Sequence, residues 1–139
     1  MYACSMAAGS NPVPKKRLAT RTVPARRVDT ILAEHRADSE PLAFVKIDVQ
    51  GCEFSVCRGL TAALERSPGA AVAIEYAPVE IEEQGGDPRE LLDFFRERGY
   101  TVHLLTKDGR SRLLTASVLG SALERRGYAD LLCLPHGTA

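Results

Sequence analysis

The sequence predicts an α/β protein with an open, parallel or mixed β-sheet. Two observations support this prediction. Short apolar runs at residues 42–49, 70–76, 100–105 and 130–134 are typical of buried strands. Between them lie segments whose apolar residues recur three and four positions apart, which is the period of an amphipathic helix. Strands that alternate with helices in this way are typical of a single sheet covered by helices on both faces, here with about four strands.

The first half of the chain yields four elements in order. Residues 21–27 contain Val23 and are expected to form a short strand, and Asp29 or Thr30 is a candidate cap for a short helix. Residues 42–49 form a nearly continuous apolar strand. Residues 53–66 are expected as one helix that ends at Ser67-Pro-Gly69, because one stripe of it is apolar: Phe54, Cys57, Leu60, Ala63 and Leu64.

The second half begins with the strand at residues 70–76, followed by a long polar connection over 77–87. Asp87 and Pro88 are a cap and a first helical residue, and this helix is expected to end at Gly99. After the strand 100–105, the sequence Lys107-Asp-Gly109 predicts a turn. A helix over 115–126, closed by Gly127, and the strand 130–134 complete the order.

Composition excludes several classes of protein. The chain has 139 residues, 45% of them hydrophobic, which suits one soluble globular domain. Lys and Arg total 18, as do Asp and Glu, so net charge favours neither nucleic acid nor an anionic membrane as a partner. No run approaches the roughly 20 apolar residues of a membrane span. We therefore expect a cytoplasmic protein with a loop or disordered segment at residues 1–20.

Cysteine and histidine spacing gives no metal motif. The four cysteines, at positions 4, 52, 57 and 133, form no Cys-x-x-Cys pair, and none has a histidine at ligand spacing. They are interpreted as small packing residues in a reducing compartment. We expect no bound metal.

Three carboxylates are candidates for the functional site. Asp48 and Glu75 each stand at or near the carboxyl end of an apolar strand, so they would face one crevice if the two strands are parallel neighbours. Glu53, at the first turn of the next helix, could point into the same crevice. A carboxylate there can orient a substrate or act as a general base toward a hydroxyl. The alternatives are structural: Asp48 caps a helix, Glu53 favours the helix start electrostatically, and Glu75 pairs with an arginine.

The run at residues 44–60, Phe-Val-Lys-Ile-Asp-Val-Gln-Gly-Cys-Glu-Phe-Ser-Val-Cys-Arg-Gly-Leu, resembles the signature of the FkbM-type methyltransferases. That signature reads roughly Lys-Ile-Asp-Val-Glu-Gly-x-Glu, with a Leu-x-Gly soon after it. Gln50 stands where a Glu is usual and Cys57 where a Leu is usual. Residues 22–32, 71–76 and 91–100 are also similar to family segments, in the same order, so the resemblance covers roughly residues 21–134.

The resemblance implies a Rossmann-like, S-adenosylmethionine-dependent enzyme that methylates an oxygen of a small molecule or sugar. It further implies that the last strand of the sheet runs antiparallel, as is usual in this class. It also implies catalytic roles for Asp48, Glu53 and Glu75. The family's cofactor site includes an Asp-x-Gly-x-x-x-Gly loop and an acid after the second strand, and this sequence contains neither. Residues 21–139 therefore resemble the carboxyl-terminal part of the family's domain, and the chain is expected to have little or no activity alone.

A non-enzymatic interpretation remains open beside this one. The family's strand order would leave the strand 42–49 at an edge of the sheet, and such edges pair readily with other chains. The chain would then be a truncated remnant or an assembly module that forms a homodimer or binds a partner chain through this edge.

Overall fold

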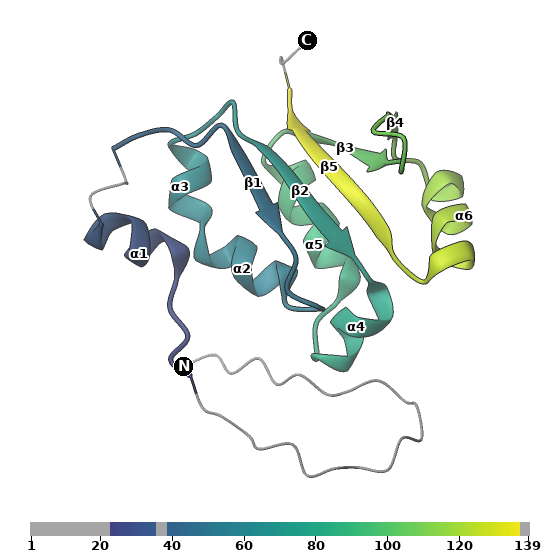
Figure 1. The fold of residues 1–139 in the computed structure, drawn as a ribbon, viewed down its shortest axis with the longest axis horizontal. Helices are drawn as coiled ribbons and strands as arrows, with labels where there is room; N and C mark the ends of the chain where they lie inside the picture. Colours follow the sequence, from purple (N-terminus) through teal and green to yellow (C-terminus); the bar gives the residue numbers. More distant parts are fainter. Residues whose placement is uncertain (1–22, 36–38, 137–139) are drawn as a thin grey trace.

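The computed structural model describes residues 23–35 and 39–136 and contains one open sheet with helices packed against it (Figure 1). The helices are α1 (Val28–Glu34), α2 (Glu53–Gly59), α3 (Thr61–Glu65), α4 (Pro78–Glu83), α5 (Pro88–Glu97) and α6 (Ala116–Arg126). The strands are β1 (Phe44–Ile47), β2 (Ala71–Tyr76), β3 (Tyr100–Leu105), β4 (Ser111–Leu113) and β5 (Ala129–Pro135).

The sheet has five strands in the order β1-β2-β5-β3-β4. Strands β1 and β2 are parallel, whereas β5 runs antiparallel to both of its neighbours, β2 and β3. This confirms the expected α/β class with an antiparallel last strand. The fifth strand is β4, which pairs with β3 and whose three residues are all exposed.

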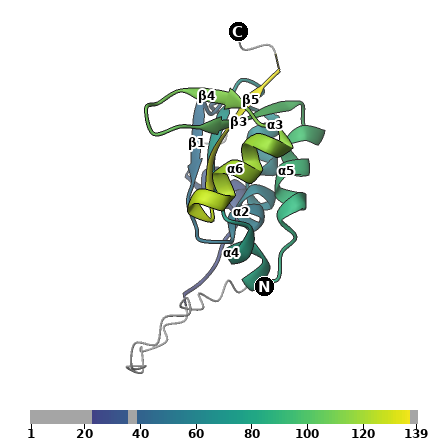
Figure 2. The same ribbon diagram turned by 90° about the vertical axis from the view of Figure 1, so that its right-hand side faces the viewer.

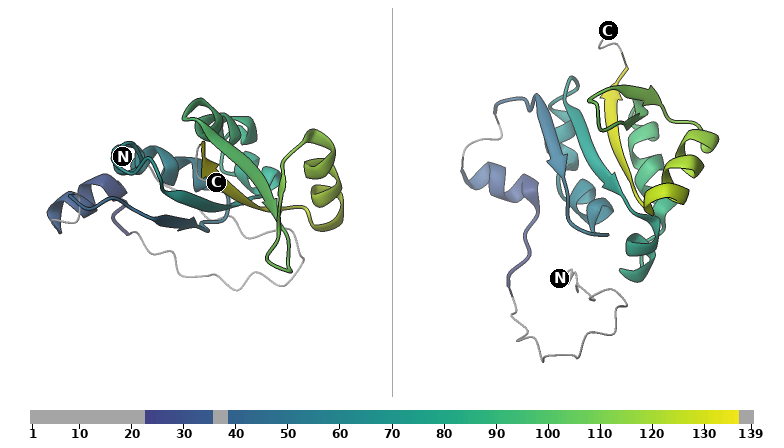
Figure 3. Two further views of the ribbon diagram at one scale, coloured as in Figure 1. Left: turned by 90° about the horizontal axis from the view of Figure 1, so that it is seen from above. Right: turned by 45° about the vertical axis from the view of Figure 1, so that its right-hand side comes forward.

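Alternating burial shows that the described helices cover one face of the sheet. Along β2, Val72, Ile74 and Tyr76 are buried, while the residues between them are partly exposed. Strands β3 and β5 alternate in the same way. Figures 2 and 3 show α2, α3 and α5 on one side of the sheet. The expected second helical layer is thus not seen among the described residues, and the opposite face is half-buried.

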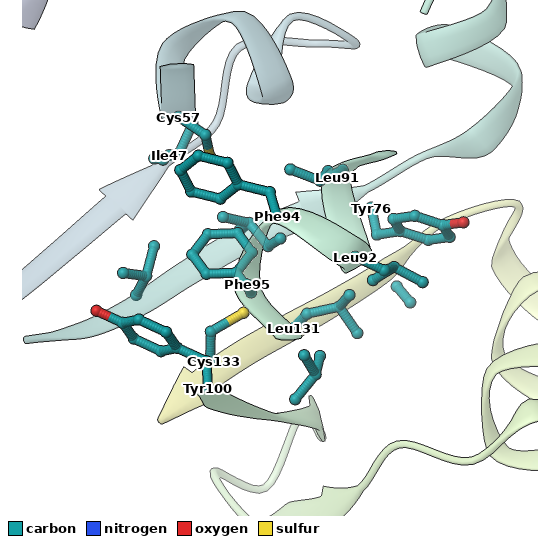
Figure 4. Packing of buried hydrophobic residues seen from close by; sticks show 14 of the residues in the cluster. Ile47, Cys57, Tyr76, Leu91, Leu92, Phe94, Phe95, Tyr100, Leu131 and Cys133 are labelled. Atoms are coloured by element: carbon teal, nitrogen blue, oxygen red, sulfur yellow. The ribbon is translucent and has the colours of Figure 1, made fainter. Parts of the chain in front are cut away.

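An aromatic cluster joins α5 to the sheet. Phe95 contacts Phe94 and Tyr100 edge to face, with ring centroids 5.2 and 5.5 Å apart. Such pairs contribute about 0.5–1.5 kcal/mol beyond their buried area. Figure 4 shows these rings with Leu131 and Cys133 of β5. The cluster anchors α5 on β3 and β5 and so fixes the helical layer behind the candidate site.

Four local expectations need correction. Residues 23–27 have no regular structure, so the described part of the strand expected at 21–27 is absent. The single helix expected over 53–66 is two helices, and the polar connection over 77–87 contains α4. The strand β4 was not foreseen. The expectation for residues 1–20 lies outside the described residues.

Asp29 gives the physical reason for the break between α2 and α3. Its two carboxylate oxygens accept hydrogen bonds from the Ala62 and Ala63 amides, at 3.2 and 2.9 Å. These amides belong to the first turn of α3, where no partner exists within the helix. A side chain from α1 therefore caps α3 across more than thirty residues of chain, and a second helix starts where a local pattern predicted continuity.

Candidate functional site

A tight turn after β1 carries the central residues of the candidate site. Gln50 and Gly51 both have positive φ angles, 51° and 90°. A β-carbon at Gly51 would lie 2.5 Å from the Glu80 carbonyl oxygen of α4, which is impossible without a shift. Glycine is therefore required here both for its backbone angle and for the close approach of α4. The turn reverses the chain from Asp48 into α2.

Glu53 holds this turn from beneath. Its side chain is 1% exposed, and Oε1 accepts hydrogen bonds from the Val49 and Gly51 amides at 3.1 and 3.3 Å. The other oxygen, Oε2, is buried and has no hydrogen-bond partner among the described residues. Glu53 thus fixes the backbone on either side of Gln50.

Gln50 joins the two strand-end carboxylates. Its Nε2 donates to Asp48 Oδ1 at 3.3 Å and to Glu75 Oε1 at 3.2 Å. Asp48 also accepts from Lys46 Nζ, 2.8 Å from Oδ2. The parallel pairing of β1 with β2 places these groups at one edge of the sheet, which is the condition under which the sequence predicts that Asp48 and Glu75 lie together.

The surroundings of Asp48 and Glu75 shift the pKa values of these two carboxyls in opposite directions. The hydrogen bond from Lys46 holds the pKa of the Asp48 carboxyl below its ordinary value, with a further contribution from Gln50. Burial raises the pKa of the Glu75 carboxyl, and the negative charges of Asp48, Glu80 and other neighbouring acids raise it further. Two carboxyls whose pKa values move apart can divide the work of holding charge and accepting a proton.

Asp130 is a third acid at this edge, and sequence reasoning missed it. It lies directly opposite Glu75 in the antiparallel β2–β5 pair, so the two side chains share one face of the sheet. Arg126 contacts Asp130 Oδ2 at 3.3 Å. In the sequence, Asp130 is only an acid at the start of an apolar strand. It becomes a candidate site residue because β5 pairs with β2.

A small cavity of about 90 Å³ lies among these side chains. Its polar lining comes from Lys46, Asp48, Glu75 and Asp130, and its apolar lining includes Leu105. Glu53 does not line it. The structure therefore brings Asp48 and Glu75 together around a cavity and places Glu53 below the turn that positions them.

Other features of the described chain narrow the chemistry. Within residues 23–35 and 39–136, no three His, Cys, Asp or Glu side chains are grouped so as to hold a metal ion. In the same part of the chain, no helix has the length and apolar character needed to cross a bilayer. Cys57 and Cys133 are buried, and burial raises the pKa of the Cys57 thiol to about 12, so neither thiol is suited to nucleophilic attack.

Comparison with known proteins identifies the family. The sequence profile described as the methyltransferase FkbM domain matches residues 4–102, which is more than half of the chain. The chain belongs to the FkbM methyltransferase family. No curated protein and no solved structure matches it significantly. The matched segment of this FkbM family member includes β1, β2 and the turn between β1 and α2.

FkbM methyltransferases generally use S-adenosylmethionine, and the hollows among the described residues are a poor fit for it. The cavity at the carboxylates is far smaller than the roughly 300 Å³ at which ligand pockets begin. A larger hollow of about 490 Å³ lies between α2 and α5, but none of the three predicted site residues lines it. No described strand leads into a glycine-rich loop. The described residues therefore do not form a complete cofactor site.

Proposed function

We propose that this chain forms the acceptor side of a methyltransferase site, and that the acceptor is a hydroxyl of a small molecule such as a sugar. Family membership and the pair Asp48 and Glu75 support this proposal. S-adenosylmethionine supplies the methyl group in such a reaction. The described residues form no complete site for it, so we propose that a partner chain contributes to holding it.

In this proposal Glu75 is the general base. Its raised pKa gives the carboxylate a higher affinity for a proton than an ordinary glutamate has, which suits it to accept the acceptor's hydroxyl proton. Asp48 stays ionised and keeps Lys46 and Gln50 in place. Glu53 acts as a positioning residue, because its carboxylate accepts hydrogen bonds from the backbone amides of the turn and does not line the cavity.

The release of S-adenosylhomocysteine from S-adenosylmethionine, over a panel of sugars and hydroxy acids, tests the proposal. We expect Glu75→Gln to lower kcat by about 100-fold or more, the usual contribution of a general base. Glu97→Gln, which neutralises an exposed acid on α5, is the matched control. Equal rates for Glu75→Gln and the unaltered chain would exclude Glu75 as the base.

Cofactor binding is tested separately by calorimetric titration with S-adenosylhomocysteine. Binding in the micromolar range would mean that the chain forms its own cofactor site. The absence of heat from a folded sample would mean that a partner chain is required, and the activity panel would then be repeated with that chain.

We propose assembly as a second candidate function, because β1 is an edge strand. It has β2 as its one neighbour in the described sheet, and Phe44 on it is 55% exposed. An unpaired edge with an exposed aromatic residue favours pairing with a second copy of the chain. Light scattering across a concentration series tests this. A dimer that Phe44→Glu dissociates would support assembly, whereas a monomer at every concentration would contradict it.

A further inference from the structure

The larger hollow, of about 490 Å³ between α2 and α5, shares no lining residue with the cavity at the carboxylates. Two rings line it, Phe54 of α2 and Phe94 of α5, and they contact edge to face with their centroids 6.1 Å apart. Phe94 is buried, whereas Phe54 is only half-buried. An aromatic side chain that stays accessible in a hollow offers a large apolar contact surface to a further group.

Both arginines that line the hollow are engaged with its rings. The Arg58 guanidinium lies over the Phe54 ring, 5.8 Å from the centroid. The Arg98 guanidinium lies over the Phe94 ring, 3.8 Å from the centroid. The acids that line the hollow come from α5, and one of them, the exposed Glu90, has no ion-pair partner within residues 23–35 and 39–136. An occupant of complementary chemistry therefore has an apolar residue for the rings and a cation for Glu90.

The described chain starts beside this hollow. The Arg27 guanidinium donates a hydrogen bond of 2.9 Å to the carbonyl oxygen of Arg58, which lines the hollow. A β-carbon at Gly59 would lie 3.6 Å from the α-carbon of Arg27, so the backbone also lies against the end of α2. Extended chain spans up to about 30 Å from Arg27 back to Leu18. The residues that precede Val23 can therefore reach the rings and Glu90.

The sequence before Val23 has the complementary pattern. Residues 15–22 read Lys-Lys-Arg-Leu-Ala-Thr-Arg-Thr, in which one leucine stands between cations. We propose that this segment docks in the hollow, with the Leu18 side chain on the two rings and a lysine of the segment paired with Glu90. Burial of the leucine supplies most of the binding, since exposed ion pairs contribute little and mainly set the register. This docking does not depend on the proposed methyl transfer, because the hollow and the cavity are lined by different residues.

The test is cross-linking of the full chain at low salt with a water-soluble carbodiimide, on an equal mixture of ¹⁴N-labelled and ¹⁵N-labelled samples. The reagent forms an amide between a lysine amine and a carboxylate in contact with it, and mass spectrometry identifies the joined peptides. We expect the lysines of the segment to be joined to Glu90 within one isotopic form. Glu124, an exposed acid on α6, is the matched control and should give no product. Added salt should lower the yield at Glu90, because it screens exposed charges.

A variant that removes no reacting group tests the apolar contact. Leu18→Ser should lower the yield at Glu90 about tenfold, the effect of losing one buried leucine side chain. Ala19→Ser, at the next position, should keep the yield of the unaltered chain.

Three results would overturn the proposal. They are a yield at Glu90 no higher than at Glu124, an equal yield from Leu18→Ser, and products that join only one isotopic form to the other. The last result would assign the hollow to a second copy of the chain. If Leu18→Ser does not fold, nuclear Overhauser effects between the Leu18 methyl groups and the Phe54 ring of the unaltered chain replace it, and their absence would overturn the docking.

Discussion

The Glu53 carboxylate accepts a hydrogen bond from the Gly51 amide, whose nitrogen lies 3.3 Å from Oε1, and through this bond it fixes the turn that separates β1 from α2. A second bond, from the Val49 amide, secures the other side of the turn. A buried glutamate at a helix start therefore supports backbone that is otherwise without partners, and a measurable part of the fold's stability depends on it.

Removing this support should destabilise the protein. We expect Glu53→Ala to lower the free energy of unfolding by about 2–3 kcal/mol, because buried amides lose a charged partner. Glu53→Gln keeps an acceptor oxygen and should lose less. Urea denaturation measures both, with Ser55→Ala, an exposed change on the same helix, as the control. A Glu53→Ala chain as stable as the Ser55→Ala chain would contradict the role given to Glu53.

Gly51→Ala isolates the cost of the close approach between the turn and α4. The positive φ alone costs about 1–2 kcal/mol in an L-residue, and the added methyl group would also meet the Glu80 carbonyl at 2.5 Å. Gly85→Ala is the matched control, since its φ of 78° is similar and nothing lies within 4 Å of its added β-carbon. Thermal unfolding should show a larger loss for Gly51→Ala, and equal losses would mean that α4 does not press on the turn.

Gln50→Glu should destabilise the site through charge. The variant replaces a donor to Asp48 and Glu75 with a third carboxylate, so attraction becomes repulsion. At neutral pH and low salt we expect it to unfold at a lower temperature than Gln50→Ala, which only removes the amide. Added salt should narrow the gap, because it screens exposed charges. A gap that does not respond to salt would show that the effect is not electrostatic.

Stability should also depend on pH through Glu75. Because its folded-state pKa is raised, the folded protein binds this proton more tightly than the unfolded chain does. The contribution of Glu75 to the free energy of unfolding is therefore fully present below the ordinary glutamate pKa. It is lost as the pH rises through the raised pKa of the folded protein. We expect Glu75→Gln to increase the melting temperature at pH 7 and to have less effect in acid. A melting temperature lowered equally at both pH values would contradict this sign.

Sequence alone located β1, β2, β3 and β5, because apolar runs are strong local signals, and the parallel pairing of β1 with β2 meets the condition under which Asp48 and Glu75 share one edge. The strand Tyr100–Leu105 and the cap Asp87, which accepts from the Arg89 amide, lie where the pattern placed them. The helix α4 was missed because Pro-Val-Glu-Ile-Glu-Glu has little apolar periodicity and buries only Ile81.

The remaining errors have tertiary causes. The break after Gly59 depends on Asp29, which reaches α3 from a distant helix. Strand β4 exists through its pairing with β3 and has no buried residue of its own. Asp130 joins the candidate site because β5 inserts beside β2, and Glu53 is buried because the turn wraps over it. Most of these contacts join residues far apart in the sequence, and none of them produces a periodic pattern of apolar residues from which it could be predicted.

The position of β5 determines how folding can proceed during synthesis. It is the last of the described strands along the chain, yet it lies in the middle of the sheet between β2 and β3. Until residues 129–135 emerge from the ribosome, β1 with β2 and β3 with β4 are two separate pairs, and isolated two-stranded pairs are marginally stable in water. The described sheet is therefore complete only after β5 has been synthesised. A chain that ended before Ala129 would expose the unpaired edges of two strand pairs, which chaperones and proteases recognise.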